Sequence, residues 1–116
     1  MKSYTGTCHC GDVEFEFDVD AEEITDGLRR NCSICKRLAC VHSMKVDPKD
    51  LRLTKDEDKI HTYTWSDFEI PFTFSKNCGV YVYYNTDYQC RVNLGCVDEV
   101  DTFNLTMHFF DGKHEL

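Results

Sequence analysis

Residues 8–20 read CHCGDVEFEFDVD and join a close pair of cysteines to a segment in which apolar and acidic residues alternate. In an extended strand successive side chains point to opposite faces, so every second residue of this segment shares a face. One face is apolar and consists of Val13, Phe15, Phe17 and Val19; the other is acidic. The stretch therefore predicts a strand over residues 12–20 that is buried on one side and solvated on the other.

Strand-forming residues also dominate the rest of the chain. Strands are predicted over 41–46, 51–53, 61–65, 80–84, 88–94 and 103–110. Turns or loops are predicted at 47–50, 55–58 and 111–112, where Asp, Pro, Lys and Gly gather. Helical patterns are weak: residues 21–30 contain good helix formers without an apolar stripe, and residues 32–38 suffice for one or two turns. We expect one domain over residues 1–116 of the mainly β class, with short strands and metal-binding loops.

Composition and charge exclude several function classes. The net charge of −8 in 116 residues opposes a nucleic-acid binder that works by neutralising phosphates. No apolar run approaches the roughly 20 residues of a membrane-spanning helix. Residues 1–6 carry a lysine without an apolar segment behind it, so no secretory signal is recognised. We therefore expect a cytoplasmic protein that binds neither nucleic acid nor membranes.

The chain contains eight cysteines, which admit either a disulfide framework or metal binding. Their close spacing favours metal. Cys8-x-Cys10 and Cys32-x-x-Cys35 are pairs that can turn two sulfurs toward one ion. Residues 75–79 read SKNCG, which is the pattern of a C-x-x-C-G knuckle with Ser75 in the first position. Residues 30–35 read RNCSIC, which is C-x-C-x-x-C with Arg30 in the first position. The other cysteines are predicted to be buried thiols: Cys40, Cys90 and Cys96.

The order and spacing of these motifs resemble the glutathione-dependent formaldehyde-activating enzyme family, which includes the domain of centromere protein V. The resemblance covers nearly the whole chain. It runs through 8–11 (CHCG), 31–37 (NCSICKR), 74–81, 92–96 (VNLGC) and 110–112 (FDG). It implies a small β-tent of short antiparallel sheets with zinc-knuckle loops.

The resemblance also implies two zinc sites. The structural site of the family falls on Cys8, Cys10, Ser75 and Cys78, and the catalytic site falls on Arg30, Cys32 and Cys35. Each site has thus lost one cysteine. A neutral serine hydroxyl is a poor zinc ligand, so the fourth place at the first site is left to water, His9 or another cysteine. Arg30 brings a fixed positive charge to the second site. Zinc is therefore expected at the first site and disfavoured at the second.

Cys32 and Cys35 also admit a redox interpretation. Arg29, Arg30 and the pair Lys36-Arg37 flank them, and positive charge lowers the pKa of a thiol. A pair with a raised thiolate fraction could cycle between dithiol and disulfide. The alternative is a remnant of a metal knuckle without chemistry. The basic cluster itself either receives ligand carboxylates through Arg30 and Arg37 or is a solvated edge.

The leading functional prediction is a zinc-dependent carbon–sulfur lyase-like protein. Its partner would be a small thiol adduct such as S-(hydroxymethyl)glutathione, with Cys32 and Cys35 as catalytic residues and Arg30 and Arg37 binding substrate. Zinc would act as a Lewis acid on a sulfur or hydroxyl. Two alternatives stay open. One is a zinc-stabilised binding module that has lost catalysis, and the other is a thiol–disulfide protein that uses Cys32 and Cys35. Neither the substrate nor the oligomeric state follows from the sequence.

Overall fold

The computed structural model describes residues 1–65 and 69–115, and three small sheets organise them. The first sheet is antiparallel with the order β1-β2-β4, and the second is antiparallel with the order β5-β6-β7-β8. The strands are β1 (Lys2–Thr7), β2 (Glu14–Val19), β4 (Leu51–Leu53), β5 (Ile60–Trp65), β6 (Ile70–Ser75), β7 (Tyr81–Asn85) and β8 (Cys90–Val92). The predicted mainly β class with small antiparallel sheets is thus confirmed.

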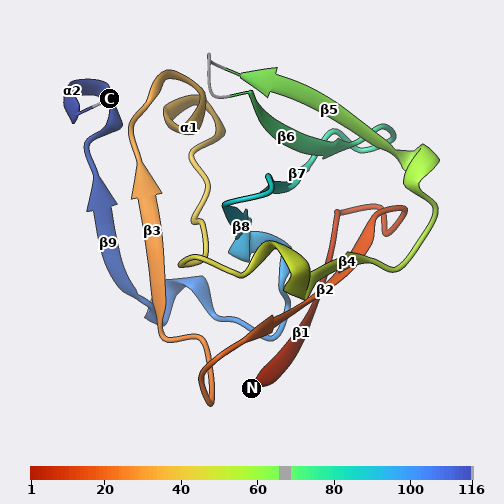
Figure 1. Ribbon diagram of the computed structural model, residues 1–116, viewed down its shortest axis with the longest axis horizontal. Helices are drawn as coiled ribbons and strands as arrows, with labels where there is room; N and C mark the ends of the chain where they lie inside the picture. Colours follow the sequence, from red (N-terminus) through yellow and green to blue (C-terminus); the bar gives the residue numbers. More distant parts are fainter. Residues whose placement is uncertain (66–68, 116) are drawn as a thin grey trace.

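The third sheet departs from that prediction because its two strands are parallel. β3 (Asp26–Arg30) pairs with β9 (Thr106–Phe110), so that Arg30 lies opposite Phe110. In Figure 1 this pair stands at the left, and the short helix α1 (Ser33–Leu38) lies between it and the β5–β6 hairpin. A second short helix, α2 (Gly112–Glu115), follows β9. Four single turns of 3₁₀ helix lie at 48–50, 57–59, 94–96 and 102–104.

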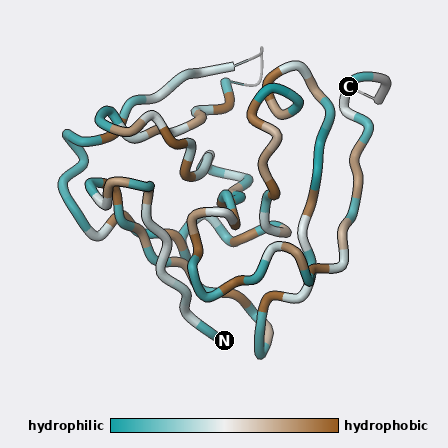
Figure 2. The backbone as a smooth tube through the Cα atoms, turned by 180° about the vertical axis from the view of Figure 1, so that it is seen from behind, coloured by the Kyte–Doolittle hydropathy of each residue, from teal (hydrophilic) through white to brown (hydrophobic). Residues whose placement is uncertain are grey.

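The alternating segment forms β2 as expected, and its apolar face fills the main core. Phe15 and Phe17 are fully buried, and the ring of Phe15 packs edge-on against Tyr83 of β7 at 5.2 Å between centroids. The first sheet is thereby packed against the four-stranded sheet. Gly6 of β1 is required at this point, since a Cβ there would lie 2.3 Å from the Phe15 ring. In Figure 2 the hydrophilic turns lie at the periphery of the fold.

Two segments correct the sequence predictions. Residues 41–46 form no continuous strand and instead make isolated bridges, of His42 to Leu28 and to Asn93 and of Val46 to Cys90. This segment crosses between the sheets, so its backbone bonds to several partners in turn. Residues 26–30, within a stretch of helix formers, form β3, because pairing with β9 overrides local propensity.

Two further strands were not predicted, and two are shorter than predicted; one of these is β8, which covers Cys90–Val92 within the predicted 88–94. Lys2–Thr7 and Ile70–Ser75 are strands that the pattern did not indicate. The segment predicted over 103–110 begins as a 3₁₀ turn and becomes a strand at Thr106.

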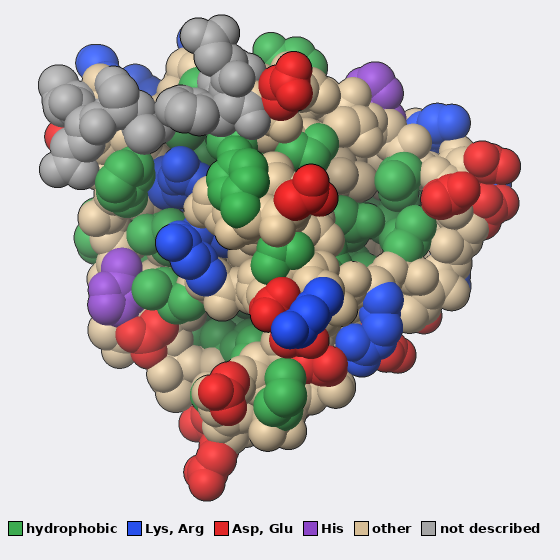
Figure 3. Space-filling model, in the orientation of Figure 1, with side chains coloured by type: hydrophobic (Ala, Val, Ile, Leu, Met, Phe, Trp, Pro, Cys, Tyr) green, Lys and Arg blue, Asp and Glu red, His purple; other side chains and the backbone are tan. Residues whose placement is uncertain are grey.

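Among the described residues, no helix is long and apolar enough to cross a membrane. Acidic side chains are spread over the face in Figure 3, in keeping with the net charge of −8.

Candidate metal centre and the buried cysteine cluster

The turn between β1 and β2 presents the first two cysteines. The backbone N–H of Gly11 donates to the Cys8 carbonyl at 3.3 Å, and the N–H of Cys8 donates to the carbonyl of Val13 at 3.0 Å. Gly11 has φ +85°, a conformation that favours glycine. The N–H of Val13 then points at the Cys8 sulfur at 3.3 Å. The CHCG sequence thus folds so that two sulfurs face the same side, with one already accepting a backbone hydrogen bond.

The turn between β6 and β7 presents the third cysteine, Cys78. In this turn the backbone N–H of Gly79 donates to the Ser75 carbonyl at 3.0 Å, and Gly79 has φ +75°. The N–H groups of Asn77 and Cys78 donate to Ser75 Oγ at 3.3 and 3.2 Å. The SKNCG segment therefore has the shape of a metal knuckle, with an oxygen in its first position.

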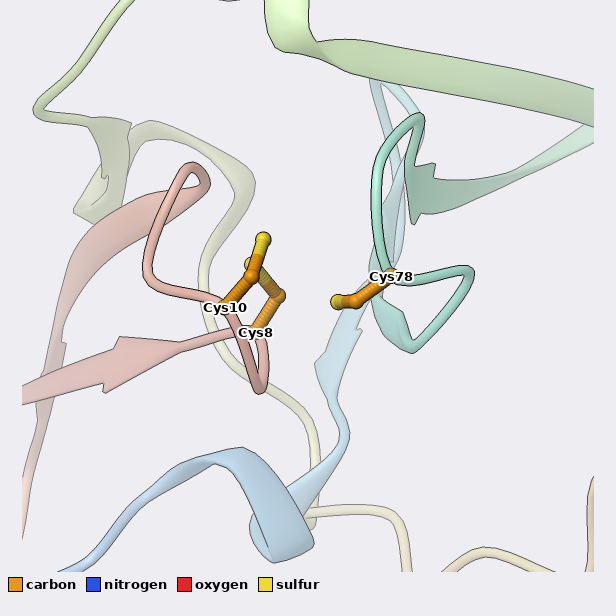
Figure 4. Close-up of side chains that lie close together, drawn as sticks. All are labelled: Cys8, Cys10 and Cys78. Carbon is orange, nitrogen blue, oxygen red and sulfur yellow. The ribbon is translucent and has the colours of Figure 1, made fainter.

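The two turns meet although they belong to different sheets. The sulfurs of Cys8, Cys10 and Cys78 all lie within 4.8 Å of one another. Figure 4 shows Cys78 pointing toward the Cys8–Cys10 pair across the gap between the turns. The Cys8 and Cys10 sulfurs are 3.6 Å apart. Zinc–sulfur bonds of 2.3 Å in a tetrahedron place sulfurs about 3.8 Å apart, so this set fits a tetrahedral zinc ion.

Ser75 occupies the fourth corner of this group. Its side chain is buried, and Oγ lies 3.7 Å from the Cys10 sulfur. His9, one of the alternatives for the fourth place, is exposed on the β1–β2 turn. No other group of three or more potential ligands meets the same distance limit within residues 1–65 and 69–115.

The surroundings of the centre favour thiolate, which is the form that binds zinc. The pKa of Cys78 is lowered to about 6, chiefly by the hydrogen bond from the Ser75 hydroxyl. The pKa of Cys10 is lowered first by the backbone N–H of Asp12 and then by Asn77 and Ser75. Hydrogen bonds from the two turns thus prepare the centre for a cation.

Cys32 and Cys35 lie apart from this centre, in a second cluster beneath α1. Cys32 precedes the helix and Cys35 lies within it, and both are 3% exposed. They pack with Phe72 and Tyr84 of the four-stranded sheet. Arg30 reaches the same region: its Nη1 donates to Tyr84 Oη at 3.1 Å, and its guanidinium lies 5.5 Å from the Phe110 ring centroid. A cation with two partners therefore stands where the resemblance places a thiolate ligand.

The pKa of Cys35 is raised, so the prediction that neighbouring positive charge lowers it is wrong. Burial raises the pKa of this thiol well above its usual range, and the neighbouring Cys32 raises it further. The charge of Arg30 acts in the opposite direction but is outweighed. Cys35 is thus a protonated thiol at neutral pH, because loss of solvent decides its ionisation.

The structure adds Cys40, His42 and Tyr81 to the second cluster. The Cys40 sulfur lies 3.7 Å from His42 Nδ1, and His42 Nε2 lies 2.8 Å from Tyr81 Oη. Burial raises the pKa of Cys40 to about 11 and lowers that of His42 to about 3. Of these three, the sequence prediction names only Cys40, as a buried thiol. The spacing C-x-H at 40–42 is the signal that could have paired the first two, whereas Tyr81 joins them only in the folded chain.

Arg30 and Arg37, both predicted to bind substrate, line different hollows. Arg37 lies beside Tyr63 and Trp65 in a hollow of about 380 Å³, and its Nη1 donates to the Ser33 carbonyl. Arg30 and Phe110 line a second hollow, of about 250 Å³.

Of the remaining cysteines, Cys90 and Cys96 are buried as expected, and Cys40 is half-buried.

Two comparisons with known proteins agree on the fold. A family model described as glutathione-dependent formaldehyde-activating enzyme matches residues 3–113. The chain is also similar to the crystal structure of a Rhodobacter sphaeroides protein from a structural genomics programme. The two are 24% identical with a TM-score of 0.78, and the match covers 90% of this chain and 99% of that one. At this identity the structural likeness speaks for the fold alone.

Proposed function

The chain belongs to the glutathione-dependent formaldehyde-activating enzyme family, and from this premise we propose a zinc-dependent carbon–sulfur lyase-like protein that acts on a small thiol adduct such as S-(hydroxymethyl)glutathione. The observation that carries the proposal is the convergence of Cys8, Cys10 and Cys78 within 4.8 Å. Three thiols at tetrahedral spacing suit zinc, whose preferred soft ligand is thiolate.

The reaction of such an adduct is simple to balance. In the direction of breakdown the carbon–sulfur bond breaks, the hydroxymethyl carbon becomes the carbonyl carbon of formaldehyde, and the hydroxyl proton is transferred to the thiol sulfur. Zinc, when bound, supplies Lewis-acid polarisation of the sulfur or hydroxyl. Cys8, Cys10 and Cys78 would hold an ion at the family's structural position, and the catalytic role would fall to Cys32 and Cys35 in the second cluster. The hydrogen bonds from Asp12 to Cys10 and from Ser75 to Cys78 lower the pKa of these two thiols and so favour the thiolate that coordinates a metal.

Positioning of the adduct would fall to cationic side chains beside the hollows. Arg37 offers a guanidinium next to Tyr63 and Trp65, which suits a carboxylate on an organic chain. Arg30 has less freedom, because Tyr84 and Phe110 hold its guanidinium. Arg37 is therefore the stronger candidate for substrate binding.

A binding module without catalysis is the second candidate function, and Arg30 is the observation that favours it. At the place of the family's catalytic zinc the chain offers two buried thiols and a cation bonded to Tyr84. Such a module would bind the thiol adduct without turning it over. For the thiol–disulfide alternative, the raised pKa of Cys35 opposes only an attack by this thiol itself.

The experiment is elemental analysis of protein purified without chelator, together with turnover of a glutathione–formaldehyde adduct. We expect close to one zinc ion per chain and measurable turnover, both lost in Cys10→Ser/Cys78→Ser. Cys40→Ala, which removes a thiol outside the centre, is the matched control and should keep the ion. Zinc that persists in the double variant would overturn the metal assignment. Adduct binding without turnover would establish the binding module.

A further inference from the structure

Three arginines near the second cluster have no acidic partner. Arg29 and Arg30 are the last two residues of β3, and Arg91 lies in β8. Among the described residues none of these three forms an ion pair, whereas Arg52 is paired with two carboxylates. In a chain whose net charge is −8, positive charge is thus left unbalanced in this one region.

Arg91 is the most confined of the three. It is 9% exposed, and its Nη1 donates to the Ser43 carbonyl at 2.9 Å, but its Nε is buried without a hydrogen-bond partner in the described part of the chain. Burial raises the pKa of the neighbouring Tyr84, and the charges of Arg30 and Arg91 oppose this effect. Tyr84 is therefore a neutral phenol at neutral pH and does not balance the two cations. A buried charge without a partner costs free energy, so an anion close to these guanidiniums would stabilise the fold.

Arg30 brings this excess charge to a hollow on the surface. The hollow of about 250 Å³, which we call the arginine hollow, lies where both strands of the parallel pair end, because Arg29 is paired with Phe109 and Arg30 with Phe110. In Figure 1 this is the upper end of the pair. The residues that line the arginine hollow are Arg29, Arg30, Asn31, Phe109, Phe110 and Asp111.

The two guanidiniums of the arginine hollow are ready to meet an anion. The Nη1 of Arg30 donates to Tyr84 Oη at 3.1 Å, and the guanidinium lies 5.5 Å from the Phe110 ring centroid. These contacts hold the side chain in place, so it loses little further freedom on binding a ligand. Arg29 is exposed beside it and supplies a second planar set of N–H donors.

The rest of the wall adds an apolar surface and no competing ion pair. Phe109 is 78% exposed, so its ring is available for contact with a ligand. The carboxylate of Asp111 accepts a hydrogen bond from Asn31 Nδ2 at 2.9 Å and forms no ion pair with either arginine of the hollow. The arginine hollow therefore suits a ligand that joins an anionic group to a flat apolar one.

We propose that the arginine hollow binds a small aromatic oxyanion, a carboxylate or phosphate on a single ring, whose oxygens meet Arg29 and Arg30 and whose ring packs on Phe109. Guanidinium N–H groups match the paired oxygens of a carboxylate or phosphate. The site is separate from the metal centre and does not rest on the proposed function. It exists because β3 ends in an arginine at the position where the resemblance places a metal-binding cysteine.

The test is calorimetry with benzoate and with phenyl phosphate, and the stronger of the two identifies the anionic group. Wild-type protein should bind one of them at a single saturable site, and benzyl alcohol, which has the ring without the charge, should not bind. Arg29→Gln and Arg30→Gln should each lower the affinity at least tenfold, the loss expected for a charge-assisted hydrogen bond. Arg37→Gln removes a guanidinium from the other hollow and is the matched control, with an affinity within about twofold of the wild type. Absence of saturable binding, or an equal loss in Arg37→Gln, would overturn the inference.

A second measurement does not depend on the folding of a variant. In NMR spectra of the wild type, the bound anion should shift the side-chain Nε–H resonances of Arg29 and Arg30 and leave that of Arg37 in place. Sodium chloride at the same ionic strength should not reproduce these shifts, and a matching pattern would reduce the site to a general effect of charge and overturn it. Glutathione, which has carboxylates without a ring, should bind here at least tenfold more weakly. Equal affinity for glutathione would assign the arginine hollow to the substrate of the proposed function and would likewise overturn a separate site.

Discussion

Arg30 is the residue that most alters the chemistry of the second cluster. Its guanidinium cannot lose its proton in a protein; it contacts Tyr84 and Phe110, and its charge acts on the Cys35 thiol. At a separation of about 4–5 Å and an effective dielectric near 20, its repulsion with a divalent ion is about 6–8 kcal/mol. An arginine can swing into solvent, which lowers the realised penalty, but here it would give up its hydrogen bond to do so.

Arg30→Cys is therefore expected to add close to one zinc ion per chain at the second cluster, because it removes the charge and supplies a third thiol. Elemental analysis checks the gain. Arg30→Ala removes the charge without adding a ligand and should gain much less metal. A wild-type protein that already carries a full ion at Cys32 and Cys35 would contradict the prediction at its first step. Turnover that increases together with the metal would show that the substrate pocket has persisted.

His42 gives the fold a pH dependence of predictable sign. Its folded pKa is about 3, lowered by burial and then by Arg30 and Arg91, against an ordinary value of 6.5. Between these values the unfolded chain binds a proton that the folded chain excludes, so stability rises with pH across this window and is lost as pH falls through it. Where the unfolded chain binds about one proton more than the folded chain, the free energy of unfolding changes by about 1.4 kcal/mol per pH unit.

Urea denaturation at pH 7 and pH 5 should show this loss, and His42→Gln should reduce the difference between the two. Glutamine keeps a polar group near Tyr81 without a titratable nitrogen. The comparison between variants isolates His42, since Asp18 and Asp26 also have lowered pKa values and act in both proteins. Equal pH dependence in wild type and variant would contradict the assignment of a neutral buried imidazole.

At the scale of elements, the turns determine the geometry of the centre. Each cysteine-bearing turn uses a glycine at positive φ, Gly11 in one and Gly79 in the other, and in each a Cβ would meet open space. The cost of another residue there is therefore backbone strain and not a clash. The β6–β7 turn also holds Ser75 through two N–H bonds, so strain at Gly79 would disturb the position of Cys78.

Gly79→Ala should lower stability by about 1 kcal/mol, the ordinary cost of the left-handed conformation for a residue with a Cβ. For a domain of this size that is a fall of about 4 °C in Tm. Gly79→Asn should lose less, because asparagine visits this conformation more readily. Thermal melts of the two variants beside wild type are the measurement. An alanine variant as stable as the wild type would show that the turn has another conformation available.

At the scale of the whole molecule, the three cysteines of the candidate metal centre come from two different sheets. Cys8 and Cys10 follow β1 of the three-stranded sheet, and Cys78 follows β6 of the four-stranded one. The same two sheets meet in the core through Phe15 and Tyr83. A bound ion would thus reinforce a junction that apolar packing already forms, and its binding free energy would add to folding.

A strong chelator should accordingly lower the Tm of metal-loaded protein by several degrees without abolishing the fold. Hydrogen exchange should quicken most at residues 8–13 and 75–80, where backbone groups serve the turns. The double variant Cys10→Ser/Cys78→Ser, which should bind no ion, is the control and should melt at the same temperature with and without chelator. Superimposable melts of the metal-loaded wild type would contradict the prediction.

Local pattern was sufficient for the elements whose burial repeats along the chain. The alternation over residues 12–20 indicates β2 and its buried face, because a period of two permits only one side of a strand to face the core. The close spacing of Cys8 and Cys10, and the glycines after Cys10 and Cys78, indicated tight turns in the same way. The strand and the turns could be predicted because the atoms concerned are neighbours in sequence.

The tertiary structure decided what depends on residues distant in the chain. β3 lies in a stretch of helix formers and is a strand only because β9, near the other end, pairs with it in parallel. Cys10 and Ser75 are 65 residues apart, and no local rule brings their side chains to 3.7 Å. The ionisation of Cys35 was misjudged from its basic neighbours in sequence, since burial beneath α1 outweighs their charge. Desolvation and long-range pairing arise only once the chain has folded, which is why the sequence alone does not determine them.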